Sequence, residues 1–422
     1  MLDIALLLTQ LLVILAGARL VGRAVRLVGQ PLVIGEMLAG LALGPSFFGL
    51  VAPRALAALF PPDKMVPLAT LSQLGVILFM FVVGLRMDLG VMRGRLGSAV
   101  AISHASMVIP FVLGAGLGTW IYPELAGRGV ARLPFVLFTG AAMSVTAFPV
   151  LARILAERGL VRTRLGSIAL ACAAVDDVTA WCLLAAVVAV ARAGHALGSF
   201  AMTLAGASFF TGLAVTVGRR ALRMWLERAN RDGDGEVTAE VVGLAALLAL
   251  GFALVTEVLG VHALFGAFLA GVILPRESGF AHAIADRVES VVGTVLLPVF
   301  FMLTGLRTEI SLVSGAGLWG VFSAVLLVAV AGKLGGSAVA ARLTGLAWPE
   351  AVAIGVLMNT RGLMELVILN VGLEIGVISP ALFAMMVLMA LVTTVATSPI
   401  LSVVFRVQPQ LAPGGPEVGV RR

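Results

Sequence analysis

Two adjacent aspartates lie in the middle of a strongly apolar segment, residues 169–184, with the sequence ALACAAVDDVTAWCLL. Within a membrane helix, Asp176 and Asp177 would each cost about 2.5–3.5 kcal/mol. Hydrogen-bond networks that merely hold such helices together are usually built from uncharged Ser, Thr, Asn or Gln. The doubled aspartate therefore indicates a function. Neighbouring helical residues point about 100° apart, so the two carboxylates can line one aqueous cavity, one binding a cation and the other meeting a partner charge.

The partner charge is expected from Lys333, in the apolar sequence VAGKLGG (residues 330–336). Of the 29 basic residues in the chain, only Lys64 and Lys333 are lysine. Arginine keeps its proton in proteins, whereas a buried lysine can release it, so a lysine here suggests a charge that switches. A lysine reaching back to the membrane surface is the alternative, and it is disfavoured by the position of Lys333 well inside its apolar run. We expect Lys333 to pair with Asp176.

Two further apolar segments contain polar interruptions. Ser144 and Thr146 precede Pro149, which cannot donate a backbone hydrogen bond, so an interruption there would expose oxygen atoms suited to a cation. The second segment has the sequence MNTRG at residues 358–362, which includes Asn359 and Arg361, and Glu365 follows four residues after the arginine. Interruptions in corresponding segments of two halves are a sequence pointer to a transporter site. Arg361 and Glu365 can pair on one helix face, either as a structural pair or as part of the ion path.

The elements that carry these residues are membrane spans. Of the 422 residues, 60% are hydrophobic and only 12% are charged, against roughly 25% charged residues in soluble domains. The basic residues are scattered singly, with no basic aromatic-rich patch, which argues against a nucleic-acid partner. Cys172 and Cys182 are ten residues apart on one expected helix, too far for a disulfide. We expect an all-α polytopic membrane protein that is not an enzyme and has no cofactor.

Hydropathy predicts about 13 transmembrane helices. They lie near residues 3–21, 31–50, 66–86, 98–122, 134–156, 164–192, 198–218, 238–257, 260–275, 288–306, 313–342, 350–373 and 380–405. Of the 29 basic residues, 21 fall in the odd-numbered loops and the tail, so the positive-inside rule places the N-terminus outside and the C-terminus in the cytoplasm.

An inverted repeat is the expected organisation of these spans. An offset of seven spans reverses orientation, so residues 1–192 and 238–405 would form an inverted-topology repeat, as in secondary transporters. Span 198–218 and a cytoplasmic linker, residues 219–237, would join the two halves. The transmembrane antiporter domain is thus expected to occupy residues 1–405, followed by a short cytoplasmic tail at 406–422.

Several segments resemble one known family, the monovalent cation:proton antiporter-2 family. The likeness is greatest to the membrane part of plant cation/proton exchangers and bacterial sodium or potassium:proton antiporters, and it covers nearly the whole chain in order. The segments are residues 30–46 (QPLVIGEMLAGLALGPS), 143–155 (MSVTAFPVLARIL), 173–181 (AAVDDVTAW), 260–275 (GVHALFGAFLAGVILP), 297–306 (LPVFFMLTGL) and 357–370 (LMNTRGLMELVILN).

The resemblance implies the sodium/proton antiporter fold, with a dimerisation domain, a mobile core domain and two discontinuous helices that cross near the aspartates. It also implies a homodimer in the cell inner membrane. By this likeness Asp177 looks like the essential cation- and proton-binding carboxylate, Asp176 its neighbour, and Lys333 the lysine that pairs with Asp176. Ser144, Thr146 and Asn359 would add ion ligands at the breaks. The intact Asp-Asp pair looks more like that of electrogenic antiporters.

The resulting hypothesis is exchange of Na⁺ or K⁺ for H⁺ by alternating access, with protons and the metal ion competing for Asp177 and Asp176. A sodium-coupled symporter of an organic anion on a related fold is the alternative. An intramembrane aspartyl protease needs two carboxylates that face each other from separate helices, and the adjacency of Asp176 and Asp177 argues against it. A membrane sensor without transport would leave the two interruptions unexplained.

Overall fold

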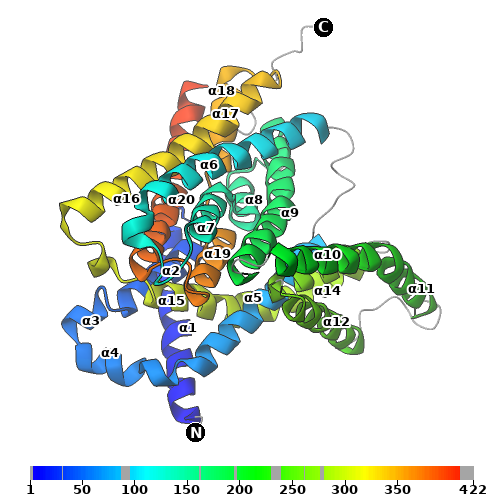
Figure 1. Ribbon diagram of the computed structural model, residues 1–422, viewed down its shortest axis with the longest axis horizontal. Coiled ribbons are helices and arrows are strands. Elements are labelled where there is room, and N and C mark those ends of the chain that lie inside the picture. The colour runs from blue at the N-terminus through cyan, green and yellow to red at the C-terminus, as the bar shows by residue number, and fades with distance from the viewer. Residues whose placement is uncertain are drawn as a thin grey trace. The chain divides into compact units, whose positions relative to one another are not determined.

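The computed structural model of the chain describes residues 3–30, 32–86, 96–160, 163–193, 197–229, 239–260, 262–275 and 280–408 (Figure 1). In these ranges the secondary structure is helical, apart from one isolated antiparallel bridge between Ala126 and Ile378. Nine helices in the described part are long and apolar enough to cross a membrane. The expected all-α membrane protein is confirmed at this level, whereas the number of crossings and the inverted repeat stay predictions.

The amino-terminal half is helical within the expected spans, and it has two further short helical segments, at residues 53–59 and 62–64, between the expected spans 31–50 and 66–86. The elements are α1 (Ile4–Leu27), α2 (Leu32–Leu43), α3 (Phe48–Val51), α4 (Pro53–Leu59), the 3-10 turn η1 (Pro62–Lys64), α5 (Val66–Arg86), α6 (Leu96–Leu125), α7 (Arg132–Ser144), α8 (Phe148–Glu157), α9 (Arg164–Ala193), α10 (Leu197–Leu213), the π-helical turn η3 (Ala214–Gly218) and α11 (Arg219–Ala229).

The carboxy-terminal half continues in the same way. Its elements are α12 (Ala239–Val258), α13 (Ala263–Ile273), α14 (Phe280–Val291), the π-helical turn η5 (Val292–Leu296), α15 (Leu297–Leu306), the 3-10 turn η6 (Ile310–Leu312), α16 (Gly315–Val330), the π-helical turn η7 (Ala331–Gly335), α17 (Gly336–Leu343), α18 (Trp348–Met358), α19 (Leu363–Glu374) and α20 (Pro380–Val407).

The predicted linker at 219–237 begins as a helix. Its first eleven residues form α11, which continues α10 through the π-helical turn η3. Most of these residues are good helix formers, RRALRMWLERA, so the change from apolar to basic composition does not end the helix. The rest of the linker, residues 230–237, and the tail from residue 409 lie outside the described residues.

The chain forms two compact units, each assembled from separate stretches. Unit 1 comprises residues 1–18, 52–88 and 185–303, and unit 2 comprises residues 19–51, 89–184 and 304–422. The aspartates, the lysine and both predicted interruptions fall in unit 2. Because each unit draws on both halves of the sequence, the spans that form one unit are not consecutive.

In unit 1, α5 packs against α13 and α14, and α12 packs against α13. A Cβ atom on Gly271 would lie 2.2 Å from the carbonyl oxygen of Phe81, so a glycine is what lets α13 approach the backbone of α5 this closely.

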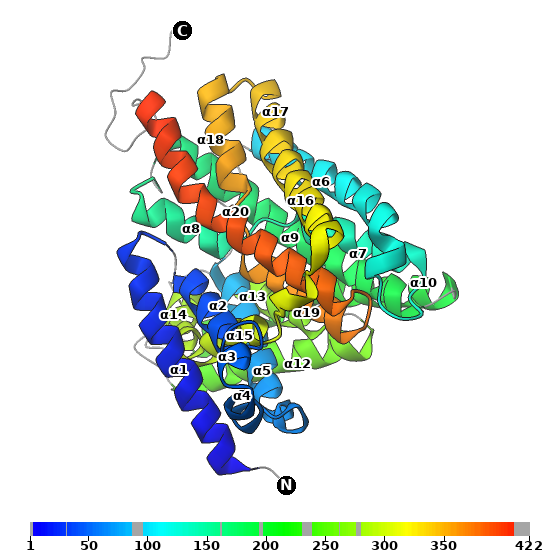
Figure 2. The same ribbon diagram turned by 90° about the vertical axis from the view of Figure 1, so that its left-hand side faces the viewer.

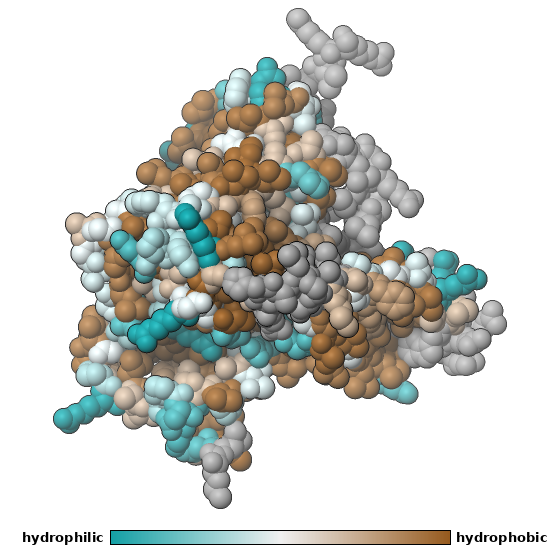
Figure 3. Space-filling view, viewed as in Figure 1, coloured by the Kyte–Doolittle hydropathy of each residue, from teal (hydrophilic) through white to brown (hydrophobic). Residues whose placement is uncertain are grey.

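Just before α1, the amide of Leu6 and the ammonium group of Lys64 lower the pKa of Asp3. Apolar side chains remain exposed along α12, Leu247 and Leu254 among them. This surface suits lipid chains, and brown patches of the same kind cover much of the face in Figure 3.

In unit 2, α6 runs beside α7 and also beside α16 and α17, while α18 packs between α17 and α20 (Figures 1 and 2). Between these helices lies a tightly buried apolar core that includes Leu151, Cys172, Ile354 and Leu357. Into this core the unit also places charged side chains with no exposed surface. Those charges and the two helix breaks form the candidate site.

Candidate functional site

The first predicted interruption separates α7 from α8. Helix α7 ends at Ser144, Val145 is extended with φ −84° and ψ 141°, and α8 begins at Phe148. Pro149 therefore falls in the first turn of α8, where a helix has no use for the missing N–H group. The break therefore lies just before Pro149, where the sequence predicts it.

The second interruption separates α18, which ends at Met358, from α19, which begins at Leu363. The two breaks bind each other through the backbone, because the amide of Ala147 donates to the carbonyl oxygen of Thr360 at 3.0 Å. Gly362 permits this approach: a Cβ atom there would lie 2.7 Å from Cγ2 of Val150. The two discontinuous helices thus meet at their interruptions.

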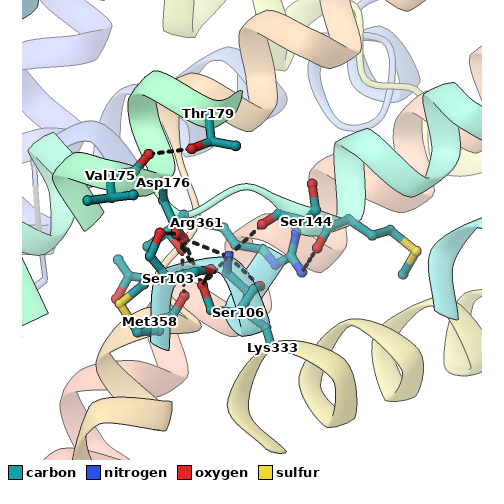
Figure 4. Close-up of polar contacts among 12 residues, drawn as sticks. Ser103, Ser106, Ser144, Val175, Asp176, Thr179, Lys333, Met358 and Arg361 are labelled. Carbon is teal, nitrogen blue, oxygen red and sulfur yellow. Dashed lines mark hydrogen bonds and ion pairs between the residues drawn. The ribbon is translucent and has the colours of Figure 1, made fainter. Parts of the chain in front are cut away.

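Asp176 is fully buried and accepts hydrogen bonds from three hydroxyl groups (Figure 4). Ser103 Oγ donates to Oδ1 at 2.5 Å, Thr146 Oγ1 to Oδ2 at 2.6 Å, and Ser106 Oγ lies 3.0 Å from Oδ2. Lys333 Nζ also donates to Oδ2, at 3.0 Å, and forms the expected ion pair. The carboxylate of Asp176 is therefore fully solvated by protein donors, which is the condition for keeping a buried charge.

Lys333 is held in a π-helical turn, η7, that interrupts span 313–342. Besides Asp176, its ammonium group donates to the carbonyl oxygen of Ser144 at 2.5 Å and to that of Ser106 at 2.9 Å. Three donor protons thus meet three acceptors. Gly355 lets α18 approach this turn, because a Cβ atom there would lie 2.5 Å from the carbonyl oxygen of Leu334. Such turns recur at functional sites.

Asp177 has a different environment although it follows Asp176 directly. Its side chain is fully buried, and neither carboxylate oxygen accepts a hydrogen bond from a described residue. The backbone amide of Phe148, at the start of α8, lies near enough to act on its charge without forming a well-directed hydrogen bond. An ionised Asp177 therefore lacks the donors that a buried carboxylate needs.

Arg361 and Glu365 form a buried ion pair, with Nη1 and Oε1 3.1 Å apart. No well-directed hydrogen bond accompanies it, since both oxygens of Glu365 lack a described donor. The guanidinium group donates instead to the carbonyl oxygen of Met143, at 2.9 Å. Lys333 and Arg361 thus bind the carbonyl groups at the end of α7, where a helix leaves acceptors unpaired and carries partial negative charge. In this structure Arg361 joins the two breaks.

The residues predicted to be ion ligands have different contacts in the structure. Thr146 contacts Asp176 and not Asp177, and Ser144 contributes its backbone carbonyl to Lys333 while its hydroxyl donates to Ala141. The side-chain oxygen of Asn359, at the end of α18, is buried without a described donor. Ser103 and Ser106 are the residues that sequence reasoning missed. Two serines at positions i and i+3 of an apolar span share one helix face, which is the signal that could have found them.

Five charged side chains act on one another around the breaks. The two cations are Lys333 and Arg361, and the three carboxyl groups belong to Asp176, Asp177 and Glu365. Two ion pairs leave Asp177 as the carboxyl group without a counter-charge. One proton or one monovalent cation would neutralise it. Among the described residues no group of three or more His, Cys, Asp or Glu side chains could hold a metal ion.

The comparison with known proteins agrees with this geometry. Residues 11–406 match the sodium/hydrogen exchanger transmembrane family. The chain is 42% identical to the Na⁺/H⁺ antiporter NhaS4 of Synechocystis, over 94% of this chain and 96% of that one. It is 39% identical to cation/H⁺ antiporter 17 of Arabidopsis thaliana, over 95% of this chain, and spans 48% of the plant protein.

A solved structure shows the same fold. The sodium proton antiporter MjNhaP1 of Methanocaldococcus jannaschii superimposes with a TM-score of 0.64 over 94% of this chain and 95% of its own, at 17% sequence identity. The family predicted from the sequence segments is therefore confirmed by the family match and the sequence relatives, and the solved structure shows the same fold. This chain belongs to the sodium/hydrogen exchanger family of membrane transport proteins.

Proposed function

We propose that this chain exchanges one monovalent cation, Na⁺ or K⁺, for protons, and that Asp177 is the group for which the two compete. The observation that carries the proposal is the unequal environment of the adjacent aspartates. Asp176 has hydroxyl and ammonium donors, whereas Asp177 is buried without an ion-pair partner and without a well-directed hydrogen bond from a described residue. A carboxyl group in that position is stable when it holds a proton or a partly dehydrated cation, and costly when it holds neither.

Competition for one carboxylate is sufficient to couple the two fluxes. A protonated Asp177 attracts no cation, and an empty ionised Asp177 is too costly to carry through a closed state. Only loaded forms would therefore cross between the two faces, so each outward cation is matched by inward protons. An inward proton gradient would then drive export of the cation by alternating access.

In this proposal the cation ligands include oxygen atoms at the helix breaks. The side-chain oxygen of Asn359 is one candidate, because it is buried and has no described donor. Ser144 and Thr146 remain candidates for another conformation, since here their polar groups serve Lys333 and Asp176. Asp176 and Lys333 would form a second charge-carrying pair that opens and closes with the state of the site.

The proposal extends to the surroundings of the protein. We place it in the cell inner membrane as a homodimer, with its N-terminus outside and its C-terminus in the cytoplasm. The distribution of arginines supports this orientation. Residues 1–192 and 238–405 would be the inverted halves, and the breaks between α7 and α8 and between α18 and α19 would be their corresponding interruptions.

Purified protein in proteoliposomes containing a pH-sensitive dye tests the function. After the lumen of the vesicles is made more acidic than the outside, addition of Na⁺ or K⁺ outside is expected to release protons from the lumen. Li⁺ and Rb⁺ in the same assay would rank selectivity. Uptake of a labelled organic anion that depends on Na⁺, without cation-evoked proton movement, would favour the symporter and contradict antiport.

A further inference from the structure

Thr394 of α20 binds the backbone of the second helix break. Its hydroxyl donates to the carbonyl oxygen of Arg361 at 2.7 Å and accepts from the amide of the same residue at 3.0 Å. Both residues are buried. Arg361 lies between α18 and α19, where the regular hydrogen bonds of a helix are interrupted. A single hydroxyl group therefore satisfies two buried backbone groups that need partners from elsewhere.

The neighbouring threonines of α20 use their hydroxyl groups differently. Thr393 donates to the carbonyl oxygens of Met389 and Ala390. Thr397 donates to the carbonyl oxygen of Thr393. Hydroxyl groups in helices commonly bind the preceding turn in this way. Thr394 instead binds a segment outside its own helix, so its hydroxyl contributes to the contact between elements.

Helix α20 is itself held in place near its internal proline. Pro399 has no N–H group to offer the carbonyl oxygen of Val395, and Gln30 Nε2 donates to that oxygen at 3.2 Å. Arg158, which directly follows α8, donates to the carbonyl oxygen of Ser398 at 3.0 Å. These bonds join α20 to the segment before α2 and to the end of α8. The helix can therefore serve as a fixed point for the break.

Packing holds the break less completely on one side. A cavity of about 10 Å³ lies beside Gly362 and Thr394. Apolar side chains also line this cavity, among them Ile34 and Met37 of α2 and Leu391 of α20. A backbone segment beside a cavity lacks van der Waals contacts on that side. The hydrogen bonds of Thr394 are therefore important for the position of the break.

We propose that Thr394 is a positioning residue that holds the second break in the geometry in which the cation binds. The inference deepens the proposed function and rests on it. Asn359, a candidate ligand, lies two residues before Arg361, whose guanidinium group donates to the carbonyl oxygen of Met143 on α7 at 2.9 Å. Holding the backbone of Arg361 thus positions the ligand and the link between the breaks together. A ligand that is already held in place costs less to order when the cation binds.

The variant Thr394→Val keeps the branched shape of the side chain and removes its hydroxyl. The amide and carbonyl groups of Arg361 then lose their partner, so binding of the cation must order the break. At fixed pH, the cation concentration for half-maximal exchange in proteoliposomes is expected to rise about tenfold, the equivalent of one net hydrogen bond. The maximal rate should change less than about twofold, because the carboxyl groups that bind the proton are unchanged.

Thr393→Val is the matched control, because it makes the same change at the adjacent buried residue, whose hydroxyl serves its own helix. It should leave the half-saturating cation concentration unchanged. Thr394→Ser keeps the hydroxyl and should behave like the original protein. Thr394→Cys, with a weaker donor, should show a smaller increase than Thr394→Val, and it carries the comparison if Thr394→Val does not fold. Equal effects of Thr393→Val and Thr394→Val, or a Thr394→Ser variant as impaired as Thr394→Val, would overturn the proposal.

Hydrogen–deuterium exchange of the purified protein supplies a measurement that does not need transport. The amide of Arg361 should exchange about tenfold faster in Thr394→Val than in the original protein or in Thr393→Val, because it has lost its acceptor. Faster amide exchange in a protein that transports no cation would refute the proposed function and keep the role of Thr394 at the break. An unchanged amide, or a faster one with an unchanged half-saturating cation concentration, would overturn the inference.

Discussion

Proteoliposomes containing Asp177→Asn show no cation-evoked proton movement above that of protein-free liposomes. This is the result that we expect, because asparagine keeps the shape of the side chain but can neither release a proton nor neutralise a cation. The substitution should not harm folding. It removes a buried group that is costly when ionised, so the unfolding temperature should be equal to or higher than that of the original protein.

Asp3→Asn is the matched control, because Asp3 is an exposed aspartate that pairs with Lys64 at the start of α1. It should leave exchange unchanged. A second informative variant is Asp176→Asn, which retains Asp177 but frees Lys333. If Asp177→Asn exchanges cations at the original rate, Asp177 is not the group for which protons and cations compete, and the proposed mechanism fails.

Lys333→Met should produce the largest loss of stability. It leaves the carboxylate of Asp176 buried without its counter-charge, and breaking such a pair costs about 3–5 kcal/mol. Lys333 also binds the carbonyl groups of Ser144 and Ser106, which would lose a donor. The free energy of unfolding in detergent, followed by the fluorescence of the five tryptophans, gives the measurement.

The double variant Asp176→Asn/Lys333→Met separates pairing from packing. With both charges removed, most of the lost stability should return, because neither partner remains as an uncompensated buried charge. A double variant as unstable as Lys333→Met would show that the lysine acts through packing at the π-helical turn. Lys333→Arg should preserve the charge but not the release of a proton, so it should alter the pH profile of exchange more than the stability.

Composition and local pattern were sufficient to predict the helical membrane fold and its breaks. Apolar runs of span length have few stable alternatives in lipid, where every backbone polar group must be satisfied within the helix. The first break, between Ser144 and Phe148, lies just before Pro149, and the polar residues 358–362 end α18 where expected. Carboxylates buried in such runs are costly enough to indicate function wherever they occur. The pairing of Asp176 with Lys333 also agrees with the structure.

Other features depend on contacts between residues far apart in the chain. Lys333 is 157 residues from Asp176, and Ser103 is 73 residues from it. The long apolar runs indicate which segments are helices but not which of their faces meet. The π-helical turn at Lys333 has no clear signal in its sequence, AGKLG, although such a turn changes the direction in which side chains point.

The sequence alone determined that this is a helical membrane protein with two adjacent carboxyl groups, a rare lysine and two interrupted helices. Only the tertiary structure decided which side chains these groups contact. In the folded chain the hydroxyls of Ser103, Ser106 and Thr146 contact Asp176, and Arg361 contacts both breaks. Asp177 receives no well-directed hydrogen bond from a described residue. The physical reason is that the free-energy cost of burying a charged side chain depends on its residue type. The hydrogen bonds that offset this cost depend on which donors the packing of the chain brings within about 3 Å.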